Sequence, residues 1–308
     1  MAQFSYPARQ LQFWEDAEEG LEDIATVYDS RSPPLSIERI REFALTAQGE
    51  RPPPTPSKPG HQPSEEHVDG LTAKPFWDVT AEEYQKDFPW AQKLEANAGI
   101  IIDELQAKLD REELEQSLFA GDSAWQNNVM GTGWSAFRLQ RLGVWNVENC
   151  KEFPKTSELM RSLDIPFAVR GVCFARQGAG SGVQPHTDGR NFILTSHLGL
   201  KVPEKCWIKV GEEEQSWEAG KLTTIDTSFE HSTGNPTDED RHVLIIDFWH
   251  PELTEAERAG LEYVYDLRNK FENGNIPFRK PKKLMEEEEE GMGLGALFSG
   301  MFGGGDKK

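Results

Sequence analysis

Histidine and carboxylate residues in the second half of the chain have the types and the spacing of a metal site. Of the seven histidines, five fall between positions 186 and 250. In His186-Thr187-Asp188 the imidazole and the carboxylate are two residues apart, so an extended backbone directs both to the same side. His231 follows 45 residues after His186, beyond a predicted hairpin turn at 218–221, and is the candidate third ligand. Two histidines and one carboxylate on one face of an octahedron leave three positions open, which suits Fe(II) and O₂.

An arginine at the start of an apolar strand indicates what fills two of the open positions. Arg241 precedes the most apolar strand-like run of the chain, 243–248. A guanidinium inside a β barrel is costly unless it meets an anion, and its planar fork pairs with a carboxylate through two parallel bonds. A dicarboxylate that reaches from the metal to Arg241 meets this need, and 2-oxoglutarate is the obvious candidate. The alternative is a core ion pair, for which the available partners are Asp226, Asp240 and Asp247.

Short runs of β-branched and aromatic residues recur from Trp134 onward, between turn residues. The predicted strands are 168–175, 192–196, 207–210, 222–225 and 243–248. Regular spacing of this kind is typical of a sandwich or a jelly roll. The sequence therefore predicts a mainly β fold with flanking helices, and the candidate metal ligands lie within its β region.

Three segments have apolar residues at helical spacing. Residues 36–45 form a short, weakly amphipathic pattern, and residues from 81 to about 118 carry one apolar face that we expect to lie against a sheet. Thr254 and Glu257 match a capping box at the start of a third helix, which ends before Gly274. Helices are therefore expected on both sides of the β region in the sequence.

Composition divides the chain into three parts. Prolines are dense between Gly49 and Pro63, where they remove amide donors and favour an extended, solvated linker. We therefore predict an N-terminal segment with this linker at 1–70 and one catalytic domain at 71–278. Residues 279–308 form a charged and Gly-rich flexible tail, whose apolar residues are candidates for docking on a partner.

Charge and composition exclude several classes of protein. The chain has 33 basic and 53 acidic residues, a net charge of −20, which argues against a nucleic-acid-binding surface. The three cysteines are too few and too widely spaced for a disulfide framework. No run approaches the roughly 18 to 20 apolar residues of a membrane span, and the N-terminus lacks the pattern of a secretory signal. We expect a soluble, cytoplasmic protein without a membrane span.

The sequence resembles the aspartyl/asparaginyl β-hydroxylase family. The resemblance rests on PHTDGRNFILTSHLGL at 185–200, on KVGEEEQSWEAGKLTTIDTSFEHSTGNPTDEDRHVLIIDFWHPELTEAER at 209–258, on WSAFRLQRLG at 134–143 and on PKTSELM at 154–160. It covers roughly 71–258 and is most specific from 186 to 251. It implies a double-stranded β-helix, the cupin-like jelly roll, and an Fe(II)- and 2-oxoglutarate-dependent oxygenase that uses O₂ to hydroxylate an unactivated C–H bond.

The resemblance assigns roles residue by residue. His186 and His231 match the iron-binding histidines, and Arg241 matches the arginine that holds the distal carboxylate of 2-oxoglutarate. His197 matches a histidine near the other end of that molecule. The animal enzymes have glycine two residues after the first histidine, where this chain has Asp188, so the His-x-Asp…His triad of the wider family is restored. Because related halogenases leave this position vacant for chloride, Asp188 favours hydroxylation.

Two further departures concern the cosubstrate and the substrate. A serine that helps to hold 2-oxoglutarate in the family is replaced by Ala175. The candidates to supply a cation instead are Arg176, which is its neighbour, and Arg190, Arg138 and Arg141. The arginines that the animal enzymes carry before the HLGL motif correspond to Ile193 and Thr195. The substrate therefore stays open between an Asp or Asn residue of a peptide or protein, hydroxylated at its β-carbon, and small molecules such as a free amino acid or a lipid acyl chain.

Two other functions stay open on the sequence. A non-catalytic, cupin-like binding or assembly module would use the linker or the tail, but a decayed oxygenase is expected to have lost a ligand or the arginine, and this chain keeps them all. A Zn²⁺- or Mn²⁺-dependent cupin enzyme would bind metal without needing 2-oxoglutarate. Dependence on 2-oxoglutarate therefore separates the two enzyme hypotheses.

Overall fold

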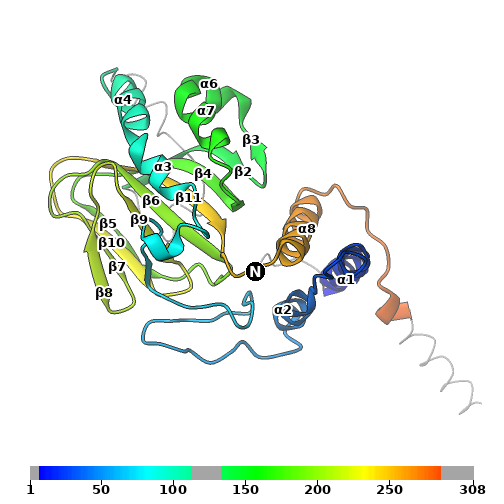
Figure 1. The fold of residues 1–308 in the computed structure, drawn as a ribbon. Coiled ribbons are helices and arrows are strands. Elements are labelled where there is room, and N and C mark those ends of the chain that lie inside the picture. Colours follow the sequence, from blue (N-terminus) through cyan, green and yellow to red (C-terminus); the bar gives the residue numbers. More distant parts are fainter. Residues whose placement is uncertain (1–6, 112–132, 286–308) are drawn as a thin grey trace, which may run out of the picture. The chain divides into compact units, whose positions relative to one another are not determined.

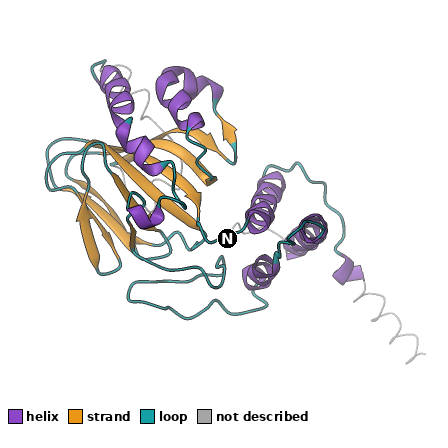
Figure 2. Cartoon of the chain, in the orientation of Figure 1, coloured by secondary structure: helices purple, strands orange, loops and turns teal. Residues whose placement is uncertain are grey.

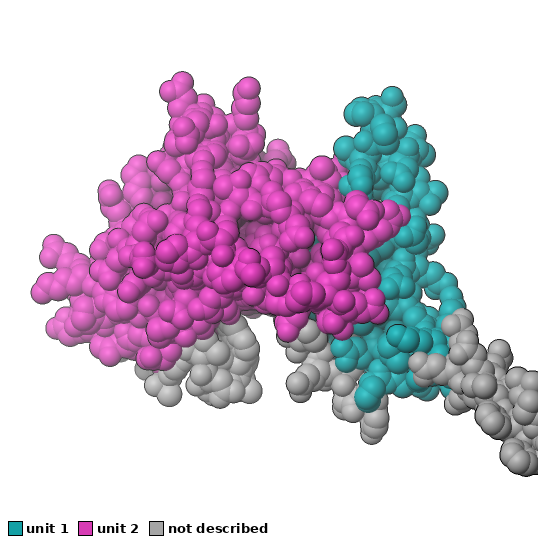
Figure 3. Space-filling model, turned by 90° about the horizontal axis from the view of Figure 1, so that it is seen from below, with its two compact units in different colours: residues 1–37, 259–308 teal, residues 38–258 magenta. Residues whose placement is uncertain are grey.

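The chain divides into two compact units. The computed structural model describes residues 7–111 and 133–285. One unit comprises residues 38–258, and the other combines residues 1–37 with 259–308 (Figure 3). The boundaries predicted at 70 and 278 remain predictions, and most of the predicted tail, from 286 onward, lies outside the described residues.

Two antiparallel sheets form the centre of the larger unit (Figure 2). The seven-stranded sheet has the order β1-β9-β6-β11-β4-β2-β3, and the four-stranded sheet has the order β5-β10-β7-β8. The strands are β1 (Phe76–Trp77), β2 (Trp134–Arg141), β3 (Val144–Trp145), β4 (Phe167–Gln177), β5 (Ser181–His186), β6 (Ile193–Lys201), β7 (Trp207–Val210), β8 (Glu213–Ser216), β9 (Leu222–Asp226), β10 (His231–Asn235) and β11 (Arg241–Trp249).

The chain path through these sheets is that of a double-stranded β-helix. From β4 onward the chain crosses repeatedly between the sheets: β4, β6, β9 and β11 belong to the large sheet, and β5, β7, β8 and β10 to the small one. Every pairing between these strands is antiparallel. The predicted cupin-like jelly roll is therefore confirmed, and each of the five predicted strands is present.

Side-chain alternation along β11 explains how one apolar strand serves both faces of the large sheet. Leu244, Ile246 and Phe248 belong to the core that the sheet forms with the helices. Val243 belongs to the core between the two sheets, and Arg241, Ile245 and Asp247 line a cavity there. Because successive strand residues point to opposite faces, the two sets are the even-numbered and the odd-numbered residues.

Helices cover the outer face of the large sheet (Figure 1). They are α3 (Ala91–Ala96), α4 (Ala98–Leu109), α6 (Val147–Glu152) and α7 (Pro154–Ser162), and a short 3₁₀ helix η1 (Glu82–Tyr84) precedes them. The helical pattern predicted from residue 81 is thus divided into η1, α3 and α4, and its last residues, 112–118, lie outside the described ranges. Leu94, Ile101 and Leu105 from that pattern are fully buried, as the apolar face requires.

The proline-rich segment is extended, but part of it is not a solvated linker. It follows α2 (Glu38–Gln48), which corresponds to the helix predicted at 36–45. His61 and Val68 are almost completely buried, and residue 61 forms an isolated antiparallel bridge with Phe229. The expectation of a solvated linker is therefore wrong for the part around His61, whereas residues 57–59 are exposed. The prolines remove amide donors, but the Gln62 amide donates to the Ser228 carbonyl oxygen, and the Gly60 carbonyl oxygen accepts from the Glu230 amide.

The predicted capping box begins α8 (Glu255–Glu272). Thr254 Oγ1 accepts from the Glu257 amide at 3.2 Å, and Glu257 Oε2 accepts from the Thr254 amide at 2.8 Å. In the smaller unit, α1 (Pro7–Asp29) was not predicted; its Phe13 packs edge-on against Phe271 of α8 at 5.4 Å. Within the described ranges, no helix combines the length and the apolar character that a membrane crossing requires.

Candidate metal centre

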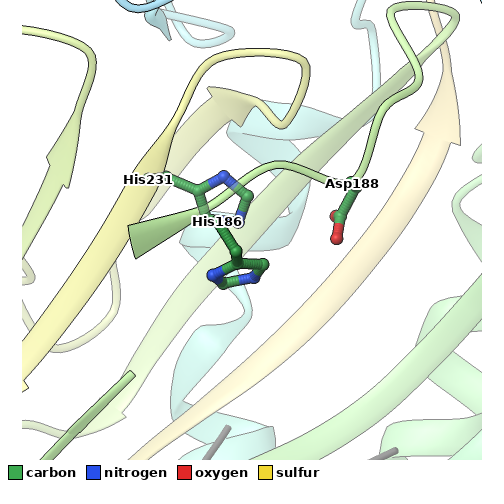
Figure 4. A group of neighbouring side chains, drawn as sticks. All are labelled: His186, Asp188 and His231. Carbon is green, nitrogen blue, oxygen red and sulfur yellow. The ribbon is translucent and has the colours of Figure 1, made fainter. Parts of the chain in front are cut away.

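The three predicted metal ligands converge at one end of the small sheet. His186 is the last residue of β5, Asp188 follows it, and His231 is the first residue of β10. Antiparallel pairing of β5 with β10 places His231 directly opposite His186. One ligand atom from each of the three side chains lies within 4.8 Å of the others, and the imidazole centroids are 4.3 Å apart (Figure 4). The pairing register of β5 and β10 thus brings residues that are 45 positions apart in the sequence into one compact set of candidate ligands.

Both imidazoles are oriented by backbone carbonyl groups. His186 Nδ1 lies 2.8 Å from the Gln184 carbonyl oxygen, and His231 Nδ1 lies 2.9 Å from that of Phe229. A neutral ring that donates through Nδ1 leaves Nε2 as a lone-pair ligand. His186 Nε2 is buried and has no hydrogen-bond partner among the described residues. Burial lowers the pKa of His231, which favours the neutral ring that a metal requires.

Arg170 connects the carboxylate ligand to a second buried acid. Its Nη1 donates to Asp188 Oδ2 at 2.5 Å, its Nε pairs with Asp247, and its Nη2 donates to Thr195 Oγ1 at 3.1 Å. Burial alone would raise the pKa of Asp188, but Arg170, and then His231, hold it well below its usual range. Asp188 is therefore ionised, and one of its oxygens is already occupied by the guanidinium.

A bulge in β4 directs Arg170 into the cavity. Opposite Ile246 and Phe248 of β11, the paired residues of β4 are Val172 and Phe167, so β4 has extra residues at this point. Gly171 in this bulge has a φ of +66°, and a Cβ there would overlap the backbone carbonyl of Gln140. The bulge interrupts the normal alternation of the strand, so that Arg170 and Cys173 both line the cavity.

Arg241 is a buried cation without a carboxylate partner among the described residues. It is 2% exposed, and its Nη2 donates to Gln177 Oε1 at 2.5 Å. Its Nε and Nη1 are buried with no hydrogen-bond acceptor in the described part of the chain. Its guanidinium carbon lies 4.4 Å from the ring centroid of Trp217. Burial lowers the pKa of Arg241 to about 10.

The core ion pair that was the alternative for Arg241 is not formed. Asp247 pairs with Arg170, and Asp240 pairs with Arg176 at 2.6 Å. Asp226 accepts from Ser228, at 2.9 Å from its amide and 2.6 Å from its hydroxyl. Each predicted partner is therefore engaged elsewhere, and within residues 7–111 and 133–285 two donors of Arg241 have no acceptor.

His197 lies in the same cavity and is held by Trp217. The indole Nε1 donates to His197 Nδ1 at 3.2 Å, and the two rings are stacked with centroids 5.9 Å apart. Burial, with the Arg241 charge as the next cause, lowers the pKa of His197 to about 3. The ring is therefore neutral at pH 7, and its proton is on Nε2 because Nδ1 accepts a bond.

A cavity of about 100 Å³ joins these residues. Its polar wall includes His186, Asp188, His197, His231 and Arg241, which are five of the six predicted site residues. The apolar wall is formed by Trp134, Cys173, Val183, Ile208, Ile225 and Ile245. The enclosure provides a largely apolar space beside the ligand set.

Arg176 is the predicted site residue that the structure does not bring to this cavity. It pairs with Asp240 and is absent from the cavity wall. Cys173 lines the cavity, and strand alternation places Arg176, three residues further on, on the opposite face of β4. The prediction relied on its sequence proximity to Ala175, which does not determine the face.

Sequence reasoning did not predict the pairing of Arg170 with Asp188 and Asp247. It also did not predict the contacts of Trp217 with His197 and Arg241. Asp247 carried a usable signal, because an acid in the middle of an apolar strand needs a buried partner. Its partner was not identifiable, since the bulge that directs Arg170 inward has no clear sequence mark beyond Gly171.

Comparison with known proteins relates this site to a family of hydroxylases. The human aspartyl/asparaginyl beta-hydroxylase is 34% identical over 202 residues, which are 64% of this chain and 26% of that protein. The human aspartate beta-hydroxylase domain-containing protein 2 is 34% identical over 148 residues, 46% of this chain and 40% of that protein. The chain thus matches about a quarter of the length of the human hydroxylase.

Solved structures with cupin domains are also similar, at low sequence identity. A Cupin 2 conserved barrel domain protein from Salinispora arenicola is 13% identical, with a TM-score of 0.27 over 47% of this chain and 95% of that one. The family model described as aspartyl/asparaginyl beta-hydroxylase matches residues 95–251, which include the ligand set and Arg241. This match covers half of the chain, so the protein belongs to the aspartyl/asparaginyl beta-hydroxylase family.

Proposed function

We propose that the protein is an Fe(II)- and 2-oxoglutarate-dependent dioxygenase that hydroxylates an unactivated C–H bond. The observation that carries the proposal is a single cavity that contains both a His-Asp-His ligand set and a guanidinium with unused donors. A ligand set alone suits many metals, and a buried arginine alone suits many anions. Together they match a cosubstrate that chelates a metal at one end and carries a carboxylate at the other.

His186, Asp188 and His231 would hold the iron. The fit is supported by the buried Nε2 of His186, which has no hydrogen-bond partner in the described part of the chain, and by the carbonyl groups that orient both rings. The Arg170 bond to Asp188 Oδ2 favours a one-oxygen contact of this carboxylate with the metal. Two imidazoles and one carboxylate oxygen are the donor set that non-haem Fe(II) oxygenases use.

Arg241 would bind the distal carboxylate of 2-oxoglutarate through Nε and Nη1. Trp217 keeps the guanidinium plane in place, and His197 offers an N–H to a carboxylate from a neighbouring position. When bound, iron and 2-oxoglutarate supply the oxidising power, with O₂ reduced as 2-oxoglutarate becomes succinate and CO₂. The apolar wall of the cavity excludes water, which protects the reaction from side paths.

The family name of the relatives supports an Asp or Asn residue of a peptide or protein, hydroxylated at its β-carbon, as the substrate. Arg138 lines the cavity and uses Nη1 to donate to the Arg170 carbonyl oxygen at 2.6 Å. A guanidinium on the wall favours a substrate group with an oxygen acceptor, such as a carboxylate or an amide. A free amino acid remains the small-molecule alternative.

Calorimetry with 2-oxoglutarate tests this proposal without a known substrate. Protein loaded anaerobically with Mn²⁺ is expected to bind 2-oxoglutarate, whereas His231→Ala is expected to lose metal-dependent binding. Arg241→Met should weaken 2-oxoglutarate binding more than a hundredfold, because the distal carboxylate of 2-oxoglutarate would be buried without a cation. Arg176→Met is the control, since Arg176 does not line the cavity.

The outcomes separate the proposal from its rivals. Metal binding without any 2-oxoglutarate binding would favour a cupin enzyme of other chemistry. No binding of either would favour the non-catalytic module. Equal 2-oxoglutarate affinity in Arg241→Met and the unaltered protein would contradict the role of Arg241.

A further inference from the structure

Residues 57–68, called the strap below, lie against the two loops that carry the metal ligands. The first ligand loop, 187–191, contains Asp188. The second ligand loop, 227–230, ends immediately before His231. Neither loop belongs to a strand, so contacts from elsewhere must fix its position. The strap makes hydrogen bonds to both loops.

The strap extends the second ligand loop as a short antiparallel pair. The Gln62 amide donates to the Ser228 carbonyl oxygen at 3.0 Å, and the Glu230 amide donates to the Gly60 carbonyl oxygen at 2.8 Å. Between these bonds the His61 ring stacks on Phe229, with centroids 5.0 Å apart. The carbonyl group of Phe229 is the one that orients the His231 ring. The strap therefore fixes the position of Phe229, whose carbonyl group orients the His231 ring.

The same strap also holds the first ligand loop. Ser64 donates through Oγ to the carbonyl oxygen of Gly189, the residue after Asp188. Asn191 Oδ1 accepts from the Val68 amide at 2.9 Å, and its Nδ2 donates to the Val68 carbonyl oxygen at 2.8 Å. Asn191 and Val68 are both buried, so these bonds are shielded from water.

The two ligand loops are joined to each other at Thr227. Its carbonyl oxygen accepts from the Asp188 amide at 3.0 Å and from the Thr187 hydroxyl at 3.1 Å. The strap, the first loop and the second loop thus form one closed hydrogen-bonded network around the position between Asp188 and His231. Displacement of any one of the three segments must alter the other two.

We infer that the strap is part of the metal centre, in which Ser64, Val68 and Gly60 are positioning residues for Asp188 and His231. This inference rests on the proposed metal site. Ligands that are held in place lose less conformational freedom when the metal binds, so the strap raises metal affinity. Because coupling between two equilibria is reciprocal, metal binding must in turn make the strap harder to open.

The first test measures metal affinity in two variants that lose bonds between the strap and the first ligand loop, called the network variants below. Ser64→Ala and Asn191→Ala remove bonds between the strap and the first ligand loop, and each is expected to weaken Mn²⁺ binding roughly five- to tenfold. Thr72→Val is the matched control, because Thr72 follows the strap closely in the sequence but its hydroxyl donates to Glu252, which belongs to neither ligand loop, at 2.6 Å. Affinities are measured by calorimetry at a temperature at which circular dichroism shows every variant to be folded.

The second test uses the reciprocal effect, which a merely structural segment would not show. Hydrogen exchange of peptides that cover 58–70 is followed by mass spectrometry in the full chain, without metal and with saturating Zn²⁺. Exchange in the strap is expected to slow at least fivefold with Zn²⁺, while exchange in α4 stays the same.

Each outcome is decisive. Slower strap exchange together with weaker Mn²⁺ binding in both network variants supports the inference. Strap exchange that does not change while 183–190 becomes protected would overturn it, as would unaltered Mn²⁺ affinity in both variants. If the unaltered protein binds neither Mn²⁺ nor Zn²⁺, the proposed metal site fails and the inference fails with it.

Discussion

Replacement of Arg241 by methionine is expected to stabilise the metal-free protein while it strongly weakens 2-oxoglutarate binding. Burial lowers the pKa of Arg241 from 12.5 to about 10. Each pKa unit corresponds to about 1.4 kcal/mol, so holding this charge in the folded state costs about 3 kcal/mol at neutral pH. Because the folded pKa lies below the unfolded one, this cost is present at every pH below about 10 and declines only above it.

Two favourable contacts of Arg241 offset part of that cost. The bond to Gln177 and the contact with the Trp217 ring are each worth about 1 kcal/mol. Methionine fills a similar volume without a charge. Arg241→Met should therefore raise the free energy of unfolding by about 1 kcal/mol, measured by urea denaturation at pH 7 on metal-free protein.

Arg170 provides the contrasting case. It is paired with Asp188 and Asp247, and the Asp247 side chain is only 1% exposed. Arg170→Met leaves two acids without their cation and should lower the free energy of unfolding by about 3–5 kcal/mol, with partial rescue by Asp247→Asn. If Arg241→Met destabilises the protein as strongly as Arg170→Met, Arg241 has a structural charge partner and the reasoning is wrong.

Three further predictions concern stability. Burial raises the pKa of Asp226 from 3.8 to about 7, so the contribution of its protonated carboxyl group to stability is present below about pH 4 and is lost as the pH rises through 7. Asp226→Asn should therefore be more stable than the unaltered protein by about 2–4 kcal/mol at pH 8 and nearly unchanged at pH 4, measured by urea denaturation. Gly171→Ala should cost about 2–4 kcal/mol in the same assay, since its Cβ would overlap the Gln140 carbonyl group at a φ of +66°; an unchanged midpoint would show that the bulge is not constrained. Thr254→Ala removes the cap that accepts from the Glu257 amide and should lower the free energy of unfolding by about 1 kcal/mol, with less helical signal by circular dichroism.

The strands that were predictable from the sequence are those that carry their own apolar side chains into the core. β11 is β-branched and apolar on both faces, so its pattern is visible without knowledge of its neighbours. β10, with the sequence HSTGN, is fully buried but has no apolar residue. It is a strand because β5 and β7 pair with it on both sides, a condition that a local pattern does not contain.

The same distinction explains which parts of the site were predictable. His186 and Asp188 are two residues apart, a spacing from which extended backbone geometry predicts that both point to one side. Arg241 was identifiable as a buried cation on an apolar strand. The position of Arg170 depends on a bulge, and the strap depends on where a proline-rich segment packs against the β domain. Both are long-range features, which composition and periodicity do not determine.

The most direct test of the central claim is an anaerobic titration of metal-free protein with Fe(II) and then 2-oxoglutarate, followed by visible absorption. The account predicts a weak charge-transfer band that requires both additions, is absent in His231→Ala, and needs much higher 2-oxoglutarate in Arg241→Met. Iron binding without such a band, or a band that forms equally well in Arg241→Met, would contradict the assignment of this cavity to iron and 2-oxoglutarate.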